Sequence, residues 1–212
     1  MTLYASLPTT PGGWPCVLAD PPWHFRARTA LQMTNWTFRR DAEKHYAVMG
    51  RDDIANMPVK QIAGRDAHLF LWTTGPCLRM AFDVIEAWGF RYSSDVFVWV
   101  KTKKRLGREL RLISSGDIGY ELHVGLGLTS RKNVEYVLLG RRGNCKRLAK
   151  DIRQVIVAPV REHSRKPDEI YPLVERYCAG PRLEIFGRQS RPGWTVWGNE
   201  ATKFDPVGGF CE

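Results

Sequence analysis

The segment Asp20-Pro21-Pro22-Trp23 limits the possible folds of this 212-residue chain more than any other. It follows the apolar run Cys16-Val17-Leu18-Ala19, which predicts a short buried strand. A Pro-Pro pair cannot continue a strand ladder or enter a helix interior, because proline has no backbone N–H. The segment therefore predicts a rigid loop at the carboxyl end of a strand, with a carboxylate, unpaired backbone carbonyls and an aromatic face. In open α/β sheets, ligands bind at that edge.

The groups in this loop suit the activation of an exocyclic amine. Such an amine is a poor nucleophile, because its lone pair is delocalised into the ring. The Asp20 carboxylate and the Pro21 carbonyl can each accept one N–H, which lets the lone pair localise on nitrogen. Trp23 offers a stacking face, and such contacts contribute roughly 1–3 kcal/mol per base in single-strand binders. The loop therefore favours a flipped-out or single-stranded adenine or cytosine. The competing interpretation is a plain turn with a packed tryptophan, since Asp-Pro often starts turns.

Beyond this loop, apolar runs alternate with amphipathic helical segments. Strands are predicted at 16–19, 67–72, 95–100, 134–139, 155–158, 183–186 and 195–197, and helices near 51–63, from Pro76 to Gly89 and at 168–180. The expected helix after Pro76 carries Leu78, Phe82, Ile85 and Trp88 on one stripe. This alternation predicts an α/β fold in which a single domain, 1–212, contains one doubly wound, mostly parallel sheet. Within it we expect a loose N-terminal lead-in at 1–13, an acceptor lid at 24–50 and a basic loop region at 101–132.

Composition favours a polyanionic partner. The formal net charge is +10 and the pI is about 9.6, a balance typical of proteins that bind nucleic acid. The basic segments 101–111 and 141–153 are candidate phosphate contacts, although a solvated basic face is the competing interpretation. No apolar run approaches the roughly 18 residues of a membrane span, so no membrane association is expected.

The cysteines and histidines give no metal-binding pattern. The five cysteines are scattered without a Cys-x-x-Cys pair, which indicates reduced thiols and no zinc site. The N-terminus lacks the basic and apolar regions of a signal peptide. We therefore expect no metal and a cytoplasmic location.

Several further segments resemble one family. They appear in order as Ala19 to Trp23; His45 to Met49; Leu69 to Thr73; Trp88-Gly89-Phe90; Trp99-Val100-Lys101; Glu135 with Leu138 to Gly143; Ser164 to Tyr171; Glu184 to Arg188; and Gly193-Trp194 with Gly198-Asn199. Together they resemble the MT-A70 methyltransferases, the family of the catalytic subunit of the eukaryotic mRNA N6-adenosine methyltransferase. In style the chain is closest to the compact bacterial and phage members.

This resemblance implies a Rossmann-like fold that binds S-adenosyl-L-methionine and methylates the N6 amine of adenine in nucleic acid. The catalytic residues implied are Asp20, Pro21, Pro22 and Trp23. The cofactor residues implied are Asp20, Lys166, Arg188, Ser190, Arg191, Asn199 and Glu200. Trp23 and Tyr46 are implied at the acceptor. Lys101, Arg161, His163 and Arg165 are added as candidate substrate contacts, because they lie at a strand end or flank Lys166.

Other functions stay open at this point. A similar loop also serves cytosine and protein-amide methylation, and a catalytically silent nucleic-acid-binding partner subunit is the alternative of another class. DNA is favoured over RNA, because a compact basic chain fits a prokaryotic or phage modification enzyme. We expect a monomer or homodimer, with a partner subunit possible.

Overall fold

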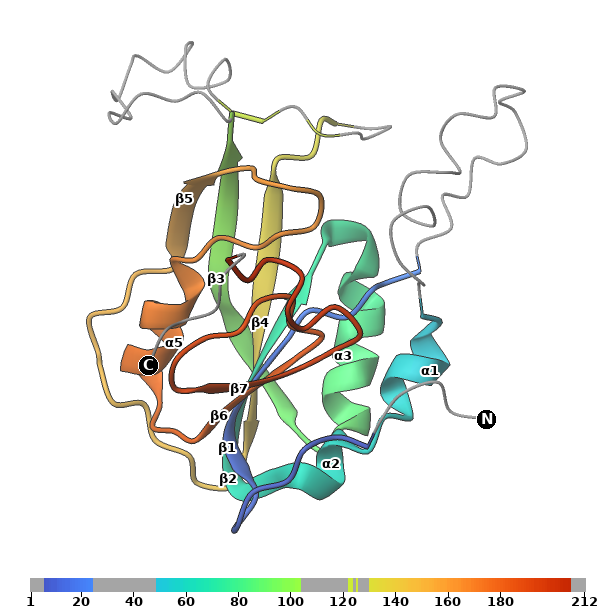
Figure 1. The fold of residues 1–212 in the computed structure, drawn as a ribbon, viewed down its shortest axis with the longest axis vertical. Helices are drawn as coiled ribbons and strands as arrows, with labels where there is room; N and C mark the ends of the chain where they lie inside the picture. Colours follow the sequence, from blue (N-terminus) through green and yellow to red (C-terminus); the bar gives the residue numbers. More distant parts are fainter. Residues whose placement is uncertain (1–5, 25–48, 104–121, 124, 126–129, 207–212) are drawn as a thin grey trace.

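The protein is built around one seven-stranded sheet (Figure 1). The computed structural model describes residues 6–24, 49–103, 122–123, 125 and 130–206. The strands are β1 (Trp14–Ala19), β2 (Ala63–Thr73), β3 (Arg91–Thr102), β4 (Val134–Arg142), β5 (Val155–Pro159), β6 (Arg182–Ile185) and β7 (Trp194–Trp197). Their order in the sheet is β5-β3-β4-β2-β1-β6-β7. All seven predicted strands are confirmed, most of them longer than expected.

The sheet is mostly parallel, as predicted, with one reversed strand. β4 runs antiparallel to both of its neighbours, β2 and β3. The other neighbouring pairs are parallel. The reversal of β4 was not predicted, and it brings the first residues of β4 to the edge where the other strands end.

Helices cover both faces of the sheet (Figure 1). The helical segments are α1 (Arg51–Ala55), α2 (Val59–Ile62), the 3-10 turn η1 (Gly75–Cys77), α3 (Leu78–Ala87) and α5 (Ile170–Tyr177). Successive residues of a strand point to opposite faces. Val17 of β1 accordingly packs in the core beneath α1, α2 and α3. Its neighbour Leu18 packs in a second core with α5. The predicted α/β class is confirmed.

Two predicted helices differ in detail. The helix expected at 51–63 is split into α1 and α2, with Pro58 at the start of α2. Proline removes a backbone donor and disfavours helical geometry in the residue before it, which explains the break. In α3, the expected stripe is shifted, because Phe82 is 36% exposed whereas Val84 is fully buried. Phe82 instead packs edge to face against Tyr92, with ring centroids 4.9 Å apart.

The expected loose lead-in is packed where it is described. Leu7 is buried in the core with α1 to α3, and the indole N–H of Trp14 donates to the Pro8 carbonyl over 2.8 Å. Of the predicted lid, only His24, Met49 and Gly50 are described, and residues 25–48 lie outside the described residues. Most of the predicted basic region 101–132 also lies outside them. No helix in the described part of the chain is long and apolar enough to cross a membrane.

Candidate active site

A cavity of about 390 Å³ opens at the edge where β1, β2, β6 and β7 end. Because these strands are parallel, the residues that follow them meet at one edge, and the reversed β4 contributes its beginning there. The cavity is lined by Asp20, Pro21, Pro22, Trp23, Thr73, Thr74, Cys77, Glu135, Ser164, Lys166, Phe186, Gly187, Arg188, Asn199 and Glu200. The sheet edge at which we expect a ligand to bind therefore contains a cavity, and the predicted loop is part of its lining.

Hydrogen bonds fix the Asp20–Trp23 loop. The Asp20 N–H donates to the Ile185 carbonyl over 3.2 Å, and the Trp23 indole N–H donates to the Trp72 carbonyl over 3.0 Å. The loop carbonyls predicted to be unpaired are in fact bonded. The Pro21 carbonyl accepts the Trp23 N–H at 2.8 Å, and the Pro22 carbonyl accepts the Met49 N–H at 2.9 Å. A carbonyl oxygen has two lone pairs, so the Pro21 oxygen keeps one for a second donor.

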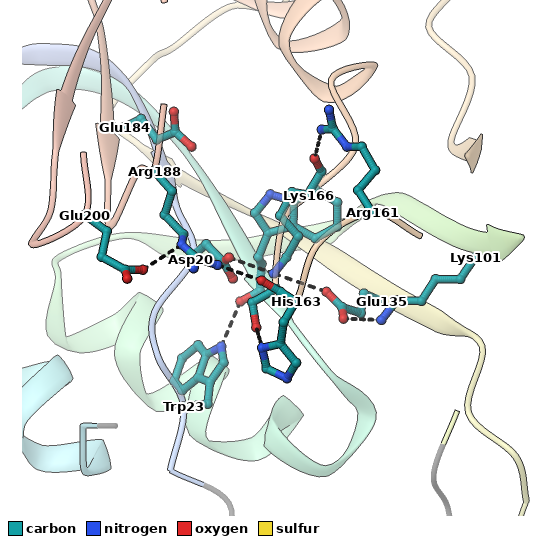
Figure 2. A network of polar contacts seen from close by, with 12 residues as sticks. Asp20, Trp23, Lys101, Glu135, Arg161, His163, Lys166, Glu184, Arg188 and Glu200 are labelled. Atoms are coloured by element: carbon teal, nitrogen blue, oxygen red, sulfur yellow. Dashed lines mark hydrogen bonds and ion pairs between the residues drawn. The ribbon is translucent and has the colours of Figure 1, made fainter. Parts of the chain in front are cut away.

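Beside the loop, acidic and basic side chains alternate (Figure 2). The Lys166 ammonium lies 2.6 Å from Oδ2 of Asp20 and 3.4 Å from Oε2 of Glu135. Lys101 forms an ion pair with the other oxygen of Glu135. The Lys166 nitrogen also lies 5.5 Å from the centroid of the Trp72 ring. The row Asp20–Lys166–Glu135–Lys101 therefore joins segments that are far apart in the sequence.

The two carboxyls in this row have opposite pKa shifts. Burial raises the pKa of Asp20 and the negative charge of Glu135 adds to the rise, while the Lys166 ammonium opposes both. Burial alone would also raise the pKa of Glu135, but the ammoniums of Lys166 and Lys101 outweigh it, so this pKa is lowered. Glu135 therefore stays ionised between two cations, whereas Asp20 is the carboxyl that gains a proton more readily.

A second ion pair forms the opposite wall. Nε of Arg188 lies 2.9 Å from Oε2 of Glu200, and another nitrogen of its guanidinium donates to the His163 carbonyl over 2.9 Å. The guanidiniums of Arg165 and Arg188 lie 4.7 and 4.9 Å from the centroid of the Phe204 ring. These contacts tie the segment after β7 to the segment before α5, and they hold Arg188 at the cavity.

The cavity brings together only part of the predicted site. Eight of the predicted residues line it: Asp20, Pro21, Pro22, Trp23, Lys166, Arg188, Asn199 and Glu200. Lys101 reaches it indirectly through Glu135. Tyr46 lies outside the described residues.

Five predicted residues lie behind the lining and contact other protein groups. Arg161 pairs with Asp168 at 2.6 Å and donates to the Lys166 carbonyl. Arg191 pairs with Asp168 and lies over the Tyr171 ring. The Ser190 N–H donates to the Asp205 carboxylate over 2.7 Å, and the Arg165 guanidinium donates to the Gln189 side-chain oxygen over 2.8 Å. The His163 ring and the Ser164 hydroxyl share a hydrogen bond of 2.9 Å. These residues support the loops that carry Lys166 and Arg188.

Two lining residues of chemical interest were given no role from the sequence. Glu135 lies in a matching segment, but only the reversed direction of β4 brings it to the cavity. Phe186 was predicted to end a strand. Instead it has a φ of 67°, in the left-handed region that bulky residues rarely adopt. No local signal in the sequence marks that conformation.

The described residues contain no group of three or more His, Cys, Asp and Glu side chains that could hold a metal ion. The four described cysteines, Cys16, Cys77, Cys145 and Cys178, are free and buried. The cavity lining offers carboxylate, ammonium, guanidinium, amide, hydroxyl, thiol and aromatic groups.

Comparison with known proteins relates this chain to a family. The family model described as MT-A70 matches residues 14–200. The N(6)-adenosine-methyltransferase MT-A70-like protein of Drosophila melanogaster is 33% identical over 91% of this chain and 28% of its own length. The N(6)-adenosine-methyltransferase catalytic subunit METTL3 of Homo sapiens is 32% identical over 89% of this chain and 28% of its own length.

A relative whose length is closer to that of this chain also matches. The type II methyltransferase M.MunI of Mycoplasma sp is 28% identical over 87% of this chain and 76% of its own length. The chain thus spans about a quarter of the two larger relatives and about three quarters of this one.

Proposed function

The chain belongs to the MT-A70 family, and from that premise we propose that it is an S-adenosylmethionine-dependent methyltransferase with a Rossmann-like fold that modifies the N6 amine of adenine in nucleic acid. One observation carries the proposal. The Asp20 carboxylate lies at the cavity, 2.6 Å from the Lys166 ammonium, in a loop that also presents the Pro21 carbonyl and the Trp23 ring. These are the acceptors and the stacking surface that an exocyclic amine on a planar base requires.

The acceptor side of the mechanism follows from these groups. Asp20 and the second lone pair of the Pro21 oxygen accept the two N–H groups of the amine. The lone pair of the amine nitrogen is then localised on that nitrogen and is no longer delocalised into the ring. Trp23 positions the base by stacking. Lys166 fixes the Asp20 carboxylate, and a fixed acceptor orients the nucleophile without reorganisation during the reaction. Asp20 is also the group placed to receive the proton that the amine loses.

The cavity residues fit S-adenosylmethionine by their chemistry. The cations Lys166 and Arg188 suit a carboxylate, Asp20 suits an ammonium, and Asn199 and Glu200 suit the two hydroxyls of a ribose. The cavity volume of about 390 Å³ lies within the range of small-molecule sites. When bound, this cofactor would supply the methyl group as an electrophile at its sulfonium.

DNA is the favoured polymer. The net charge of +10 favours a polyanionic partner. The match to about three quarters of the length of the type II methyltransferase M.MunI supports a modification enzyme of the prokaryotic type. A base must leave the helix stack to reach a cavity at a sheet edge, so single-stranded and easily unpaired sites are expected to react best.

The test is transfer of labelled methyl from S-adenosylmethionine to matched DNA and RNA oligonucleotides, single- and double-stranded, followed by nucleoside mass analysis. N6-methyladenine is the expected product, with DNA preferred. Asp20→Asn keeps the shape of the side chain but replaces an acceptor oxygen with an amide donor. We expect it to lower kcat by about 10²–10³-fold, the loss typical of removing one group that stabilises developing charge.

The matched control is Asp83→Asn, which removes an exposed carboxylate that pairs with Arg51 on the helical face. Its activity should stay within twofold of wild type. Full activity of Asp20→Asn would overturn the proposed role of the loop. Absence of N6-methyladenine from every oligonucleotide, with S-adenosylmethionine binding intact, would favour another acceptor or the silent partner subunit.

A further inference from the structure

One short segment carries much of the excess positive charge. Between residues 141 and 153 the chain has six basic residues and one acidic residue, Asp151. The whole chain has a formal net charge of +10. Half of the excess charge therefore lies in this segment, which the cavity does not use.

The segment begins at the end of the sheet opposite to the cavity. β4 runs from Val134, beside the cavity, to Arg142, and Arg141 faces Arg91 and His68 on the neighbouring strands. Glu135, in the cavity wall, lies six residues before Arg141, and at about 3.3 Å per strand residue the two are roughly 20 Å apart. In Figure 1 the chain then follows the outside of α5 to β5, in yellow and orange.

The backbone of this segment is fixed by hydrogen bonds. Arg141 donates to the Cys145 carbonyl and the Leu148 N–H donates to the Tyr177 carbonyl at the end of α5, over 2.8 and 2.9 Å. Asp151 pairs with Arg176 of α5 at 2.7 Å, which neutralises the one acid. The segment is therefore a preformed surface, and its acidic residue does not cancel its basic ones.

Four basic side chains project from this surface. Lys146, Arg147, Lys150 and Arg153 are exposed. None of the four forms an ion pair with another residue that the structure describes. Four like charges within eight residues repel one another, and binding of an anionic polymer relieves that repulsion while releasing the polymer's counterions.

We propose that Lys146, Arg147, Lys150 and Arg153 form a phosphate-binding surface, outside the cavity, for the same nucleic acid whose target base enters the cavity. This inference rests on the proposed function. Phosphate contacts position a nucleic acid without reading its sequence. At the start of the segment, the separation of roughly 20 Å corresponds to about six nucleotides of a stacked strand at 3.4 Å each, and to fewer nucleotides of an extended strand. Arg153 lies nearer to the level of the cavity, because Val155 pairs with Val98, which pairs with Tyr136 beside Glu135. The surface therefore follows the backbone from the neighbourhood of the modified base to a point several nucleotides away.

The experiment compares two variants of equal charge in direct binding assays on a series of DNA lengths. The first, Lys146→Gln with Arg153→Gln, removes two charges from the surface. The control, Lys60→Gln with Arg79→Gln, removes two exposed charges from α2 and α3, on the other face of the sheet. For a single strand of about 20 nucleotides we expect the first variant to weaken binding about tenfold and the control less than twofold.

Length and salt give the discriminating readouts. A strand of about two nucleotides is too short to place a base in the cavity and reach Lys146, so its affinity should depend much less on the four basic residues than that of the long strand. Replacing all four basic residues with Gln should make the slope of log affinity against log salt shallower by about 3 on long single strands. An unchanged slope, or equal losses on short and long strands, would overturn the proposal, and so would equal losses in the control.

These outcomes are separable from those of the proposed function, because binding is measured without turnover. A protein that shows the length-dependent loss but methylates nothing would contradict the proposed activity and support the surface. A protein that methylates short and long strands alike, with no effect of the four substitutions on binding, would support the proposed activity and contradict the proposed surface.

Discussion

At the scale of single residues, Glu135 influences how readily Asp20 keeps its charge. The negative charge of Glu135 is one of the causes that raise the pKa of Asp20. If ionised Asp20 accepts the amine N–H, activity falls as the pH drops through that raised pKa. Glu135→Gln removes the negative charge, so the pKa of Asp20 should fall and the acidic limb of the kcat/KM profile should move to lower pH.

The pH profile distinguishes this influence from a purely structural loss. The maximal rate of Glu135→Gln should also fall, because Lys166 and Lys101 lose their shared partner. Glu86→Gln, on the exposed face of α3, should leave both the limb and the maximum unchanged. A limb that stays in place or moves to higher pH in Glu135→Gln would show that Glu135 does not act through Asp20.

Glu184 is a second carboxyl whose environment has a measurable consequence. Burial raises its pKa to about 7 from an ordinary value of 4.5. It accepts a hydrogen bond from the Tyr171 hydroxyl over 2.9 Å. Between these two pKa values the unfolded chain releases the proton and the folded protein keeps it, so the free energy of unfolding decreases as the pH rises through this window.

The stability cost of ionising Glu184 should disappear in Glu184→Gln. Relative to this variant, wild type should lose on the order of 3 kcal/mol of unfolding free energy between about pH 4.5 and about pH 7. Urea unfolding of both proteins across that range measures the difference, and Glu86→Gln provides the exposed control. A constant difference between wild type and Glu184→Gln at all pH values would contradict the raised pKa.

At the scale of elements, the loops that follow β6 and β7 form one cavity wall through a close backbone approach. A Cβ on Gly198 would lie 2.9 Å from the Gly187 oxygen and 3.1 Å from the Phe186 Cα. Backbone atoms cannot yield as a flexible side chain does, so Gly198→Ala should separate the two loops. We expect a loss of about 1–3 kcal/mol in the free energy of unfolding and a clear loss of methyl transfer.

Gly75→Ala is the matched control for this change. A Cβ on Gly75 meets nothing within 4 Å, so its unfolding free energy should stay within about 0.5 kcal/mol of wild type. Thermal or urea unfolding and the labelled-methyl assay measure both variants. Equal effects of the two alanines, or a stable and fully active Gly198→Ala, would show that this approach does not constrain the cavity.

The elements also show what the sequence predicts and what it leaves out. The edge at Asp20 was predictable, because an apolar run ends directly at an acid and two prolines. The neighbourhood of Asp20 was only partly predictable, because it depends on the direction of β4. In a parallel β4, Glu135 would begin the strand at the opposite edge, far from Lys166. Strand direction depends on the connection and on side-chain packing across the whole sheet, and residue periodicity does not encode it.

At the scale of the whole molecule, the net charge of +10 has two consequences of opposite sign. Without a partner, self-repulsion destabilises the compact state, and salt screens that repulsion. Raising the salt from about 20 mM to about 200 mM should therefore raise the Tm of the free protein by a few degrees. With DNA at about 100 times its Kd, binding should add about 2.7 kcal/mol of stability at low salt.

Salt should remove the stabilisation by DNA while it stabilises the free protein, because phosphate contacts weaken steeply as salt rises. The two Tm curves should therefore converge as the salt concentration increases. Differential scanning fluorimetry with and without a 20-nucleotide strand, at about five salt concentrations, measures both trends. A protein whose Tm rises with DNA equally at all salt concentrations would bind through base contacts alone, and its basic surface would then have no part in holding the polymer.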